Sequence, residues 1–295
     1  MDLLNGRNAG PARLRELLAQ PGLVVAPGAY DALSARLVEE AGFDACYMTG
    51  FGTASGYLGR PDVGLLTMNE MVDNGRRIVG AIGLPVIADG DTGYGNAINV
   101  VRTVHEYERA GLAAIQLEDQ VMPKKCGHMA GKAVVPAAEA TKKIAAAVQA
   151  RYSNDFVIIA RTDARATDGL EAAIERGRMF RDVGADVLFI EALLNESEIE
   201  KVAETFRGVP LFFNWAEGGK TPPLSQHQIA EMGFKILIFP IGMLFAATKA
   251  MRTLLASIKQ NGTPALAAEQ MSGFDEFLDF IGLPEIRSIE EQFRD

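Results

Sequence analysis

The pattern that decides the fold is clearest in Gly111-Leu112-Ala113-Ala114-Ile115-Gln116-Leu117-Glu118. A glycine ends a segment of helical periodicity, a short apolar run follows, and an acidic residue ends that run. Glycine is favoured just after a helix because it adopts the left-handed conformation of a C-cap, and short continuous apolar runs are typical of strands covered on both faces. A glycine followed by an apolar run recurs at Gly42, Gly83, Gly184, Gly208 and Gly233, and acidic residues end two of these other runs, at Asp89 and Glu191.

Eight strands can be placed along the chain in this way. We expect them at Val24–Ala26, Ala45–Tyr47, Pro85–Ala88, Ala114–Leu117, Phe156–Ala160, Val187–Ile190, Leu211–Phe213 and Ile236–Phe239. Helical periodicity lies between them, as in Ile98–Ala110, Ala137–Tyr152, Leu170–Val183 and Ser197–Phe206. Alternating strands and helices in 295 residues predict an α/β fold, a (β/α)8 TIM-type barrel. A doubly wound open sheet is the alternative that the pattern alone leaves open.

Composition limits the classes of protein and partner. The chain has 48% hydrophobic residues and a formal net charge of -9, which disfavours nucleic acid or an anionic membrane surface as the partner. No targeting segment or membrane span is recognisable, and the two cysteines, Cys46 and Cys126, lie in unlike contexts, so we expect a cytoplasmic protein without disulfides. We expect residues 1–295 to form a single barrel domain, with 264–295 as a C-terminal helical extension that packs outside the barrel or on a partner subunit.

Polar residues follow the predicted strands, at the end of the barrel where function usually lies. The residues at the strand ends are, in chain order, Tyr47, Thr49, Asp89, Asp91, Glu118, Arg161, Asp163, Glu191, Asn214 and the apolar Pro240. Asp89, Asp91 and Glu118 are hard oxygen donors that suit a divalent ion such as Mg2+. Capping of the following helices is the alternative role for these carboxylates. Gly50 to Gly56 lies after the second strand and is expected to lead into a long loop.

A guanidinium and a thiol complete the candidate chemistry. Arg161 follows an apolar run and could grip a substrate carboxylate, or could form a structural ion pair with Glu191 or Asp163. The segment from Asp119 to Pro136 is long for a barrel connection and places Cys126 beside lysines, which favours a reactive thiolate. Such a loop is typical of a lid over substrate, although a solvated loop with an incidental cysteine is the alternative.

Several of these motifs together resemble the isocitrate lyase and phosphoenolpyruvate mutase superfamily, in the methylisocitrate lyase and 2,3-dimethylmalate lyase branch. The matching residues are Ala88-Asp89-Gly90-Asp91-Thr92-Gly93-Tyr94-Gly95, Leu117-Glu118-Asp119-Gln120, Lys124-Lys125-Cys126-Gly127-His128, Ile159-Ala160-Arg161-Thr162-Asp163-Ala164 and Asn214-Trp215-Ala216-Glu217-Gly218-Gly219-Lys220-Thr221-Pro222. They occur in the family's order. Motifs that agree in register are stronger evidence than any one of them.

The resemblance implies a barrel dependent on Mg2+, with Mn2+ as the alternative ion, and a homotetramer, a dimer of dimers, that exchanges its last barrel helix between paired subunits. It places the metal at Asp89, Asp91, Glu118 and Asp62. It places the substrate at Thr49, Gly50, Phe51, Gly127, His128, Arg161, Glu191 and Asn214. Its catalytic residues would be Tyr47, Glu118, Arg161 and Cys126, the last as the acid on the gating loop.

The implied reaction is carbon-carbon cleavage of a small di- or tricarboxylate to pyruvate and a carboxylate. Methylisocitrate lyases carry an arginine for the third carboxylate where this chain has Phe245, so a 2-alkylmalate or 2,3-dimethylmalate is favoured over methylisocitrate. The alternatives are a methylisocitrate lyase, a carboxyphosphonoenolpyruvate phosphonomutase-type enzyme, and an oxaloacetate hydrolase, which typically has serine at the position of Pro240. A non-enzymatic metal-binding scaffold is the alternative from another class.

Overall fold

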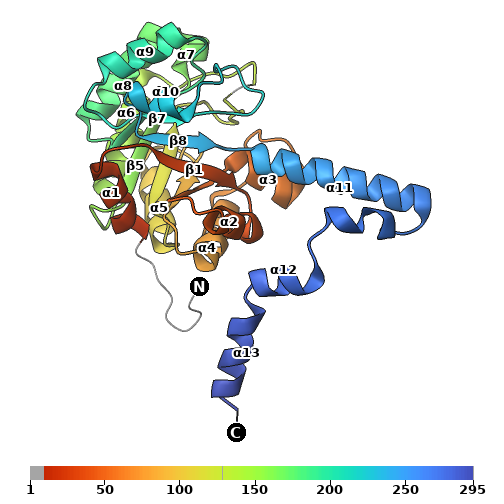
Figure 1. Ribbon diagram of the computed structural model, residues 1–295. Helices are drawn as coiled ribbons and strands as arrows, with labels where there is room; N and C mark the ends of the chain where they lie inside the picture. Colours follow the sequence, from red (N-terminus) through yellow and green to blue (C-terminus); the bar gives the residue numbers. More distant parts are fainter. Residues whose placement is uncertain (1–9, 128, 295) are drawn as a thin grey trace. The chain divides into compact units, whose positions relative to one another are not determined.

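The computed structural model describes residues 10–127 and 129–294, and its elements are labelled in Figure 1. Its strands are β1 (Val24–Ala29), β2 (Cys46–Met48), β3 (Val86–Asp89), β4 (Ala114–Glu118), β5 (Val157–Thr162), β6 (Val187–Ile190), β7 (Phe212–Asn214) and β8 (Ile236–Phe239). They form one eight-stranded sheet in the order β6-β5-β4-β3-β2-β1-β8-β7. A parallel bridge between Leu188 and Leu211 joins the two outer strands. The sheet is thus a nearly closed barrel, which confirms the predicted (β/α)8 fold and excludes a doubly wound open sheet.

Helices follow the strands along the chain. They are α1 (Gly10–Ala19), α2 (Ala32–Glu40), α3 (Gly50–Leu58), α4 (Met68–Ala81), α5 (Ala97–Arg109), α6 (Ala137–Ala150), α7 (Ala164–Thr167), α8 (Leu170–Asp182), α9 (Glu196–Thr205) and α10 (Gln226–Glu231). The glycines that follow α5 and α8, Gly111 and Gly184, have φ values of +87° and +95°, as expected for left-handed caps. Gly83 does not follow this rule, because α4 ends in extended backbone at Ile82.

The glycine-rich segment after β2 differs from the expectation. It forms helix α3, whose first turn is capped by Thr49: the side-chain oxygen accepts a hydrogen bond from the Gly52 amide at 3.2 Å. Glycine lowers helix propensity, but the capping hydroxyl and the buried positions of Gly50, Gly52, Thr53 and Ala54 compensate here. The long loop begins only at Gly59, where φ is +63°.

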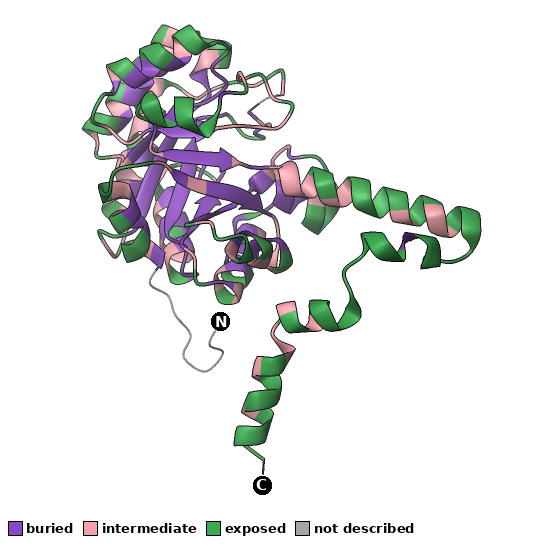
Figure 2. Ribbon diagram, in the orientation of Figure 1, coloured by how far each residue is buried: buried purple, intermediate pink, exposed green. Residues whose placement is uncertain are grey.

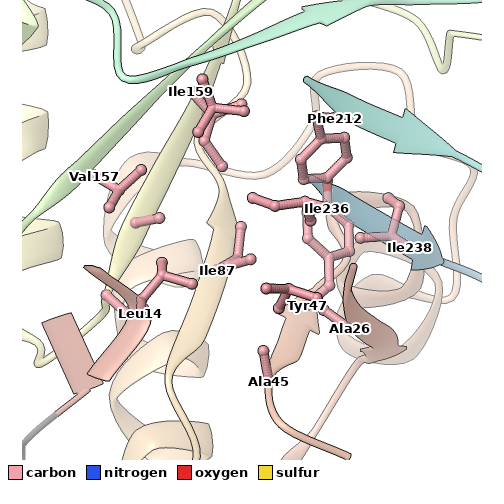
Figure 3. Packing of buried hydrophobic residues seen from close by; sticks show 14 of the residues in the cluster. Leu14, Ala26, Ala45, Tyr47, Ile87, Val157, Ile159, Phe212, Ile236 and Ile238 are labelled. Carbon is pink, nitrogen blue, oxygen red and sulfur yellow. The ribbon is translucent and has the colours of Figure 1, made fainter. Parts of the chain in front are cut away.

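The barrel interior is filled by inward-pointing side chains of the strands, shown in Figure 3. Tyr47 and Phe212 lie 6.0 Å apart between ring centroids near its middle. Leu14 and Leu17 of α1 join the same cluster beside Val24, the first residue of β1. Helix α1 therefore covers the N-terminal end of the barrel, and Figure 2 shows that most of each strand is buried. The carboxyl ends of the strands are left as the place for a site.

The chain divides into two compact units, and the boundary falls between Gly242 and Met243. The second unit contains α11 (Gly242–Asn261), of which only Gly242 belongs to the barrel unit. It also contains the 3-10 helix η1 (Ala265–Gln270), α12 (Phe274–Phe280) and α13 (Leu283–Gln292). Large apolar side chains of these elements are exposed, among them Leu255, Leu266, Phe274 and Phe293. In the part of the chain that the structure describes, no helix has the length and apolarity required to cross a membrane.

Candidate active site

The carboxyl ends of the strands bring the predicted polar residues together at one rim of the barrel. Asp89 ends β3, Glu118 ends β4, and Glu118 is paired in register with Arg161 of β5. Glu191 directly follows β6, and Asn214 ends β7. The side-chain nitrogen of Asn214 lies 3.3 Å from both carboxylate oxygens of Glu191. Adjacent parallel strands thus supply neighbouring charged groups.

Three aspartates and a lysine form one side of this rim. The Lys124 ammonium lies 2.6 Å from Oδ1 of Asp62 and 2.6 Å from Oδ1 of Asp91. Burial alone would lower the pKa of Lys124, but Asp91, Asp89 and Asp62 outweigh it and raise this pKa well above its usual value. The sequence indicated Lys124 only as part of the loop motif. Its contacts with two predicted metal ligands were missed, because they join segments far apart in the chain.

The Asp89–Asp91 segment is held in an unusual backbone conformation. Asp91 has φ of +46°, and its amide donates to Oδ1 of Asp89 at 3.0 Å. Behind it, the Tyr107 hydroxyl donates to the Asp89 carbonyl at 2.9 Å. Burial raises the pKa of Asp91 to about 7; Lys124 opposes this shift, and Asp89 and Asp62 add to it. Without another cation, Asp91 therefore binds a proton near neutral pH.

Glu118 lies between the aspartates and the arginine. Its Oε2 is 3.3 Å from a terminal nitrogen of Arg161, whereas its Oε1 is buried and has no hydrogen-bond partner among the described residues. Burial raises the pKa of Glu118 well above its usual value, although Arg161 opposes the shift. A buried carboxylate oxygen without a partner is costly unless an ion or a water completes it.

The donor set fits a hexacoordinate divalent ion that retains water. Asp89, Asp91 and Glu118 provide hard oxygens at neighbouring strand ends, and the free Oε1 of Glu118 offers a vacant acceptor. In the described ranges, no three His, Cys, Asp or Glu side chains already surround one point closely enough to hold a metal unaided. Mg2+ needs only one or two protein carboxylates together with water and substrate oxygens, so this arrangement is compatible with it.

Arg161 has partners on three sides. Its Nε and a terminal nitrogen contact the two carboxylate oxygens of Asp163 at 2.9 and 3.1 Å, and its Nε lies 3.8 Å from Glu191. Its guanidinium also stacks over the Phe189 ring, 5.2 Å from the centroid. The ion pairs that the sequence left as an alternative role are therefore present. They hold the guanidinium in a fixed orientation at the rim and do not preclude substrate binding.

Residues 121–135 form the loop that the sequence predicted as a lid, called the lid loop below, and its base is a short antiparallel contact between Gln120 and Val134. The Cys126 amide donates to the Asp62 carbonyl at 3.2 Å. Gly127 sits directly on the rim, because a Cβ added there would lie 2.5 Å from an Arg161 nitrogen and 2.8 Å from Glu191. The loop thus covers both sides of the rim and brings Cys126 to it. The predicted His128 lies outside the described residues.

The predicted catalytic Tyr47 lies on β2, and the predicted substrate residues Gly50 and Phe51 begin α3. The Tyr47 hydroxyl donates to Oε1 of Gln116 at 3.0 Å, and the Gln116 amide lies 3.4 Å from Asp89. Burial, reinforced by Asp89, raises the pKa of Tyr47 well above its usual value. The Gly50 backbone packs against Asp89, since an added Cβ would lie 3.0 Å from the Asp89 Cγ. Gln116 was missed by sequence reasoning, although it is the polar residue within an apolar strand.

Four further predicted positions can be located. Thr49 is buried and caps α3, and Phe51 follows in the first turn of that helix. Pro240 follows β8 and packs against Gly28 of β1. Phe245 belongs to α11, in the second compact unit, whereas the rim belongs to the first. The substrate argument based on Phe245 therefore stays a prediction.

Comparison with known proteins gives one consistent result. Residues 14–259 match the family model described as phosphoenolpyruvate phosphomutase. The chain is 51% identical to 2,3-dimethylmalate lyase of Eubacterium barkeri, over 96% of this chain and 97% of that protein. It is 46% identical to a 2-methylisocitrate lyase of Aeropyrum pernix, over 91% of this chain and 86% of that protein.

Solved structures agree with these relatives. A crystal structure of 2,3-dimethylmalate lyase, described as a PEP mutase/isocitrate lyase superfamily member, superposes with a TM-score of 0.92 at 43% identity, covering 96% of this chain and 95% of the other. The structure of oxaloacetate acetylhydrolase with 3,3-difluorooxalacetate superposes with a TM-score of 0.92 at 38% identity, covering 98% of both chains. The structure of phosphonopyruvate hydrolase with oxalate and Mg++ superposes with a TM-score of 0.88 at 32% identity, covering 97% of this chain and 99% of the other.

Proposed function

Because the chain belongs to the phosphoenolpyruvate phosphomutase family, we propose that it is a metal-dependent carbon-carbon lyase that cleaves a 2-alkylmalate or 2,3-dimethylmalate to pyruvate and a carboxylate. One observation carries this proposal. The lid loop places Cys126 between Lys124, which contacts Asp62 and Asp91, and Gly127, which packs on Arg161 and Glu191. A proton donor is thereby held between a candidate metal site and a guanidinium. The 51% identity with a 2,3-dimethylmalate lyase supports the choice of substrate class.

Mg2+, or Mn2+ in its place, would be held by Asp89 and Asp91, with Glu118 and Asp62 in support. When bound, such an ion would supply charge stabilisation at the substrate oxygens. The phosphonopyruvate hydrolase structure with Mg++ supports this ion. Burial and the neighbouring aspartates raise the pKa of Asp91 to about 7 in the metal-free protein, so Asp91 is partly protonated near pH 7. Metal binding would displace this proton.

The reaction begins with loss of the proton from the substrate's 2-hydroxyl group, after which the C2–C3 bond breaks. The oxygen becomes the carbonyl of pyruvate, and the electron pair of the broken bond remains on C3. Arg161 would stabilise the carboxylate attached to that carbon. Cys126 then donates its Sγ proton to C3, which releases propionate if the substrate is 2,3-dimethylmalate. The hydroxyl proton passes to solvent and the Cys126 thiolate regains a proton from solvent, so protons and electrons balance over one turnover.

Tyr47 contributes in its neutral form. Its raised pKa keeps the phenol protonated at neutral pH, so in the substrate complex its hydroxyl proton would turn from Gln116 to the oxygen that becomes the pyruvate carbonyl. The backbone of Thr49, Gly50 and Phe51 lies beside Asp89 at the start of α3. A helix N-terminus is a favourable place for the carboxylate of pyruvate. Asn214, Glu191 and Gly127 would line the other side of the substrate site, and His128, which lies outside the described residues, stays a predicted substrate-binding residue.

The substrate class is tested by pyruvate release with Mg2+ from 2-methylmalate, 2,3-dimethylmalate, larger 2-alkylmalates, 2-methylisocitrate and isocitrate. We expect an alkylmalate to be cleaved most efficiently. Cys126→Ser should lower this rate strongly, whereas Cys46→Ala, a change at the buried cysteine of β2, should not. Near-wild-type turnover by Cys126→Ser would remove the thiol from the mechanism. Preference for 2-methylisocitrate would overturn the argument from Phe245 and favour a methylisocitrate lyase.

Oxaloacetate hydrolysis is the second candidate function, because an oxaloacetate acetylhydrolase superposes over 98% of both chains. Pro240 stands where those hydrolases typically carry serine, which is why we rank this reaction second. Release of oxalate and acetate from oxaloacetate, without pyruvate from any malate, would support it. Phosphonate turnover would favour the carboxyphosphonoenolpyruvate phosphonomutase-type alternative, and no turnover at all would favour a metal-binding scaffold.

We propose that the active form is a cytoplasmic homotetramer, a dimer of dimers, in which α11 is exchanged between subunits and 264–295 extends the single barrel domain. Exposed apolar side chains such as Leu255, Leu266 and Phe274 support an assembly, since large exposed apolar surfaces usually mark interaction sites. The mass of the full-length protein in solution tests this proposal directly. A monomeric mass at all concentrations would contradict it.

A further inference from the structure

A second lysine of the lid loop, Lys132, is as deeply buried as Lys124 but contacts the opposite side of the rim. Only 2% of its side chain is exposed, and its ammonium lies 2.8 Å from Oδ1 of Asp163. The same ammonium donates to the carbonyl oxygen of Gly127. Lys132 therefore joins the tip of the lid loop to the barrel. Neither the motifs of the sequence nor the proposed mechanism gives this residue a role.

Asp163 is a fixed anchor for this contact. Its carboxylate also accepts both hydrogen bonds of Arg161, at 2.9 and 3.1 Å. Its amide donates to Asp119 at 2.9 Å, and no part of its side chain is exposed. The carboxylate is therefore shared between the lid loop and the guanidinium. When the loop lifts, Asp163 loses one of its two cationic partners while it stays buried, which is unfavourable.

We propose that Lys132 is a positioning residue that holds the lid loop closed by tying Gly127 to Asp163, and so keeps Cys126 at the reacting carbon. The catalytic part of this inference rests on the proposed lyase function, but the closing of the loop does not. Lys132 differs from Lys124 in one respect. The partners of Lys124 are proposed metal ligands, so its contacts depend on the ion, whereas Lys132 contacts a carboxylate that binds Arg161.

Hydrogen exchange of the full-length, ligand-free protein tests the closing contact. The reporter is the Cys126 amide, which bonds to the Asp62 carbonyl when the loop is closed. In Lys132→Met, which keeps the length of the chain without the charge, we expect this amide to exchange about tenfold faster. Lys132→Arg should restore most of the protection. Lys142→Met, a change at an exposed lysine of α6, should have no effect.

Unchanged exchange at Cys126 in Lys132→Met would overturn the proposal, as would equal loss of protection in Lys132→Arg. If Lys132→Met does not fold, as judged by exchange in β4 and β5, Lys132→Gln replaces it, because glutamine keeps a donor for Gly127 but no charge for Asp163. With a substrate that the wild type cleaves, Lys132→Met should lower kcat by about tenfold and change KM less. If the wild type cleaves none, the lyase proposal fails while the exchange result still decides the role of Lys132.

Discussion

The two sides of the barrel mouth differ in how their charges are balanced. On the arginine side (Arg161, Asp163, Glu191 and Lys132), Arg161 and Lys132 both contact Asp163. Arg161 also approaches Glu191 and Glu118, and Glu118 lies between the two sides. On the carboxylate side (Asp62, Asp89, Asp91 and Lys124), three acidic groups face the one ammonium of Lys124. Burial raises the pKa of Asp91 to about 7 there.

On the arginine side, the protein's own carboxylates already hold the guanidinium in place. The carboxylate side instead needs an additional cation to balance its charge. A guanidinium held by fixed carboxylates costs no reorganisation when an anionic substrate arrives. Buried carboxylates in excess of their cationic partners instead take up a proton or a metal ion. The lid loop spans both sides with one lysine each. Four predictions test whether the two sides of the barrel mouth have different roles.

The largest effect is expected from Asp91→Asn on the carboxylate side. Loss of a metal ligand should lower the rate of pyruvate release by about a thousandfold or more. Stability should not fall with it, because a carboxylate whose pKa is raised by burial destabilises the fold once it is ionised. Turnover is measured with Mg2+, and thermal unfolding is measured on the metal-free protein. Asp73→Asn, at an exposed residue of α4, is the control, and near-normal turnover of Asp91→Asn would contradict the metal assignment.

Arg161→Lys tests the arginine side and should affect both properties. We expect kcat/KM to fall by about a hundredfold, because an ammonium cannot replace the bidentate geometry, and the free energy of unfolding to fall by about 2 kcal/mol. Arg165→Lys is a matched control, since Arg165 makes a similar two-point contact with Glu198 at 2.9 and 2.6 Å. That variant should lose stability but retain activity. Activity loss of equal size in both would show that the effect is structural.

Gly127→Ala should separate closing of the lid loop from binding on either side. The added Cβ would lie 2.5 Å from Arg161 and 2.8 Å from Glu191, so the loop cannot reach its closed position. We expect kcat to fall by about thirtyfold with little change in Mg2+ affinity. Gly80→Ala, in α4, where an added Cβ meets nothing within 4 Å, should leave kcat unchanged. Wild-type kcat in Gly127→Ala would mean that turnover does not require the closed loop.

The barrel and the polar ends of its strands could be predicted because both depend on local patterns. Glycine caps and apolar runs located all eight strands, and parallel strands necessarily bring Asp89, Glu118 and Arg161 to one rim. Helix α3 was mistaken for the start of a loop, because its glycines lower helix propensity and the cap at Thr49 decides the outcome.

Contacts between distant segments could not be predicted in the same way. Lys124 and Lys132 are two of the lysines in a polar loop, and their sequence does not say which carboxylate each one meets. Their partners, Asp62 and Asp163, are separated from them by 62 and 31 residues respectively. Only closure of the barrel and folding of the loop over it bring these charges together. The assignment of chemistry to the site residues, unlike the fold, stays a prediction.

The smallest effect concerns the pH dependence of Mg2+ binding on the carboxylate side. Asp91, with a pKa of about 7 in the metal-free protein, carries a proton below that pH and loses it above. The proton competes with the ion, so Mg2+ affinity should rise by about tenfold from pH 6 to pH 8 and level off above.

The contribution of Asp91 to the stability of the metal-free protein has the opposite sign. Its proton stabilises the fold below the raised pKa, and that stability is lost as the pH rises through about 7. Calorimetry in buffers of different ionisation enthalpy measures the affinity and the proton released. An affinity that is flat between pH 6 and pH 8 would show that Lys124 already keeps Asp91 ionised, and that the two sides of the mouth are balanced alike.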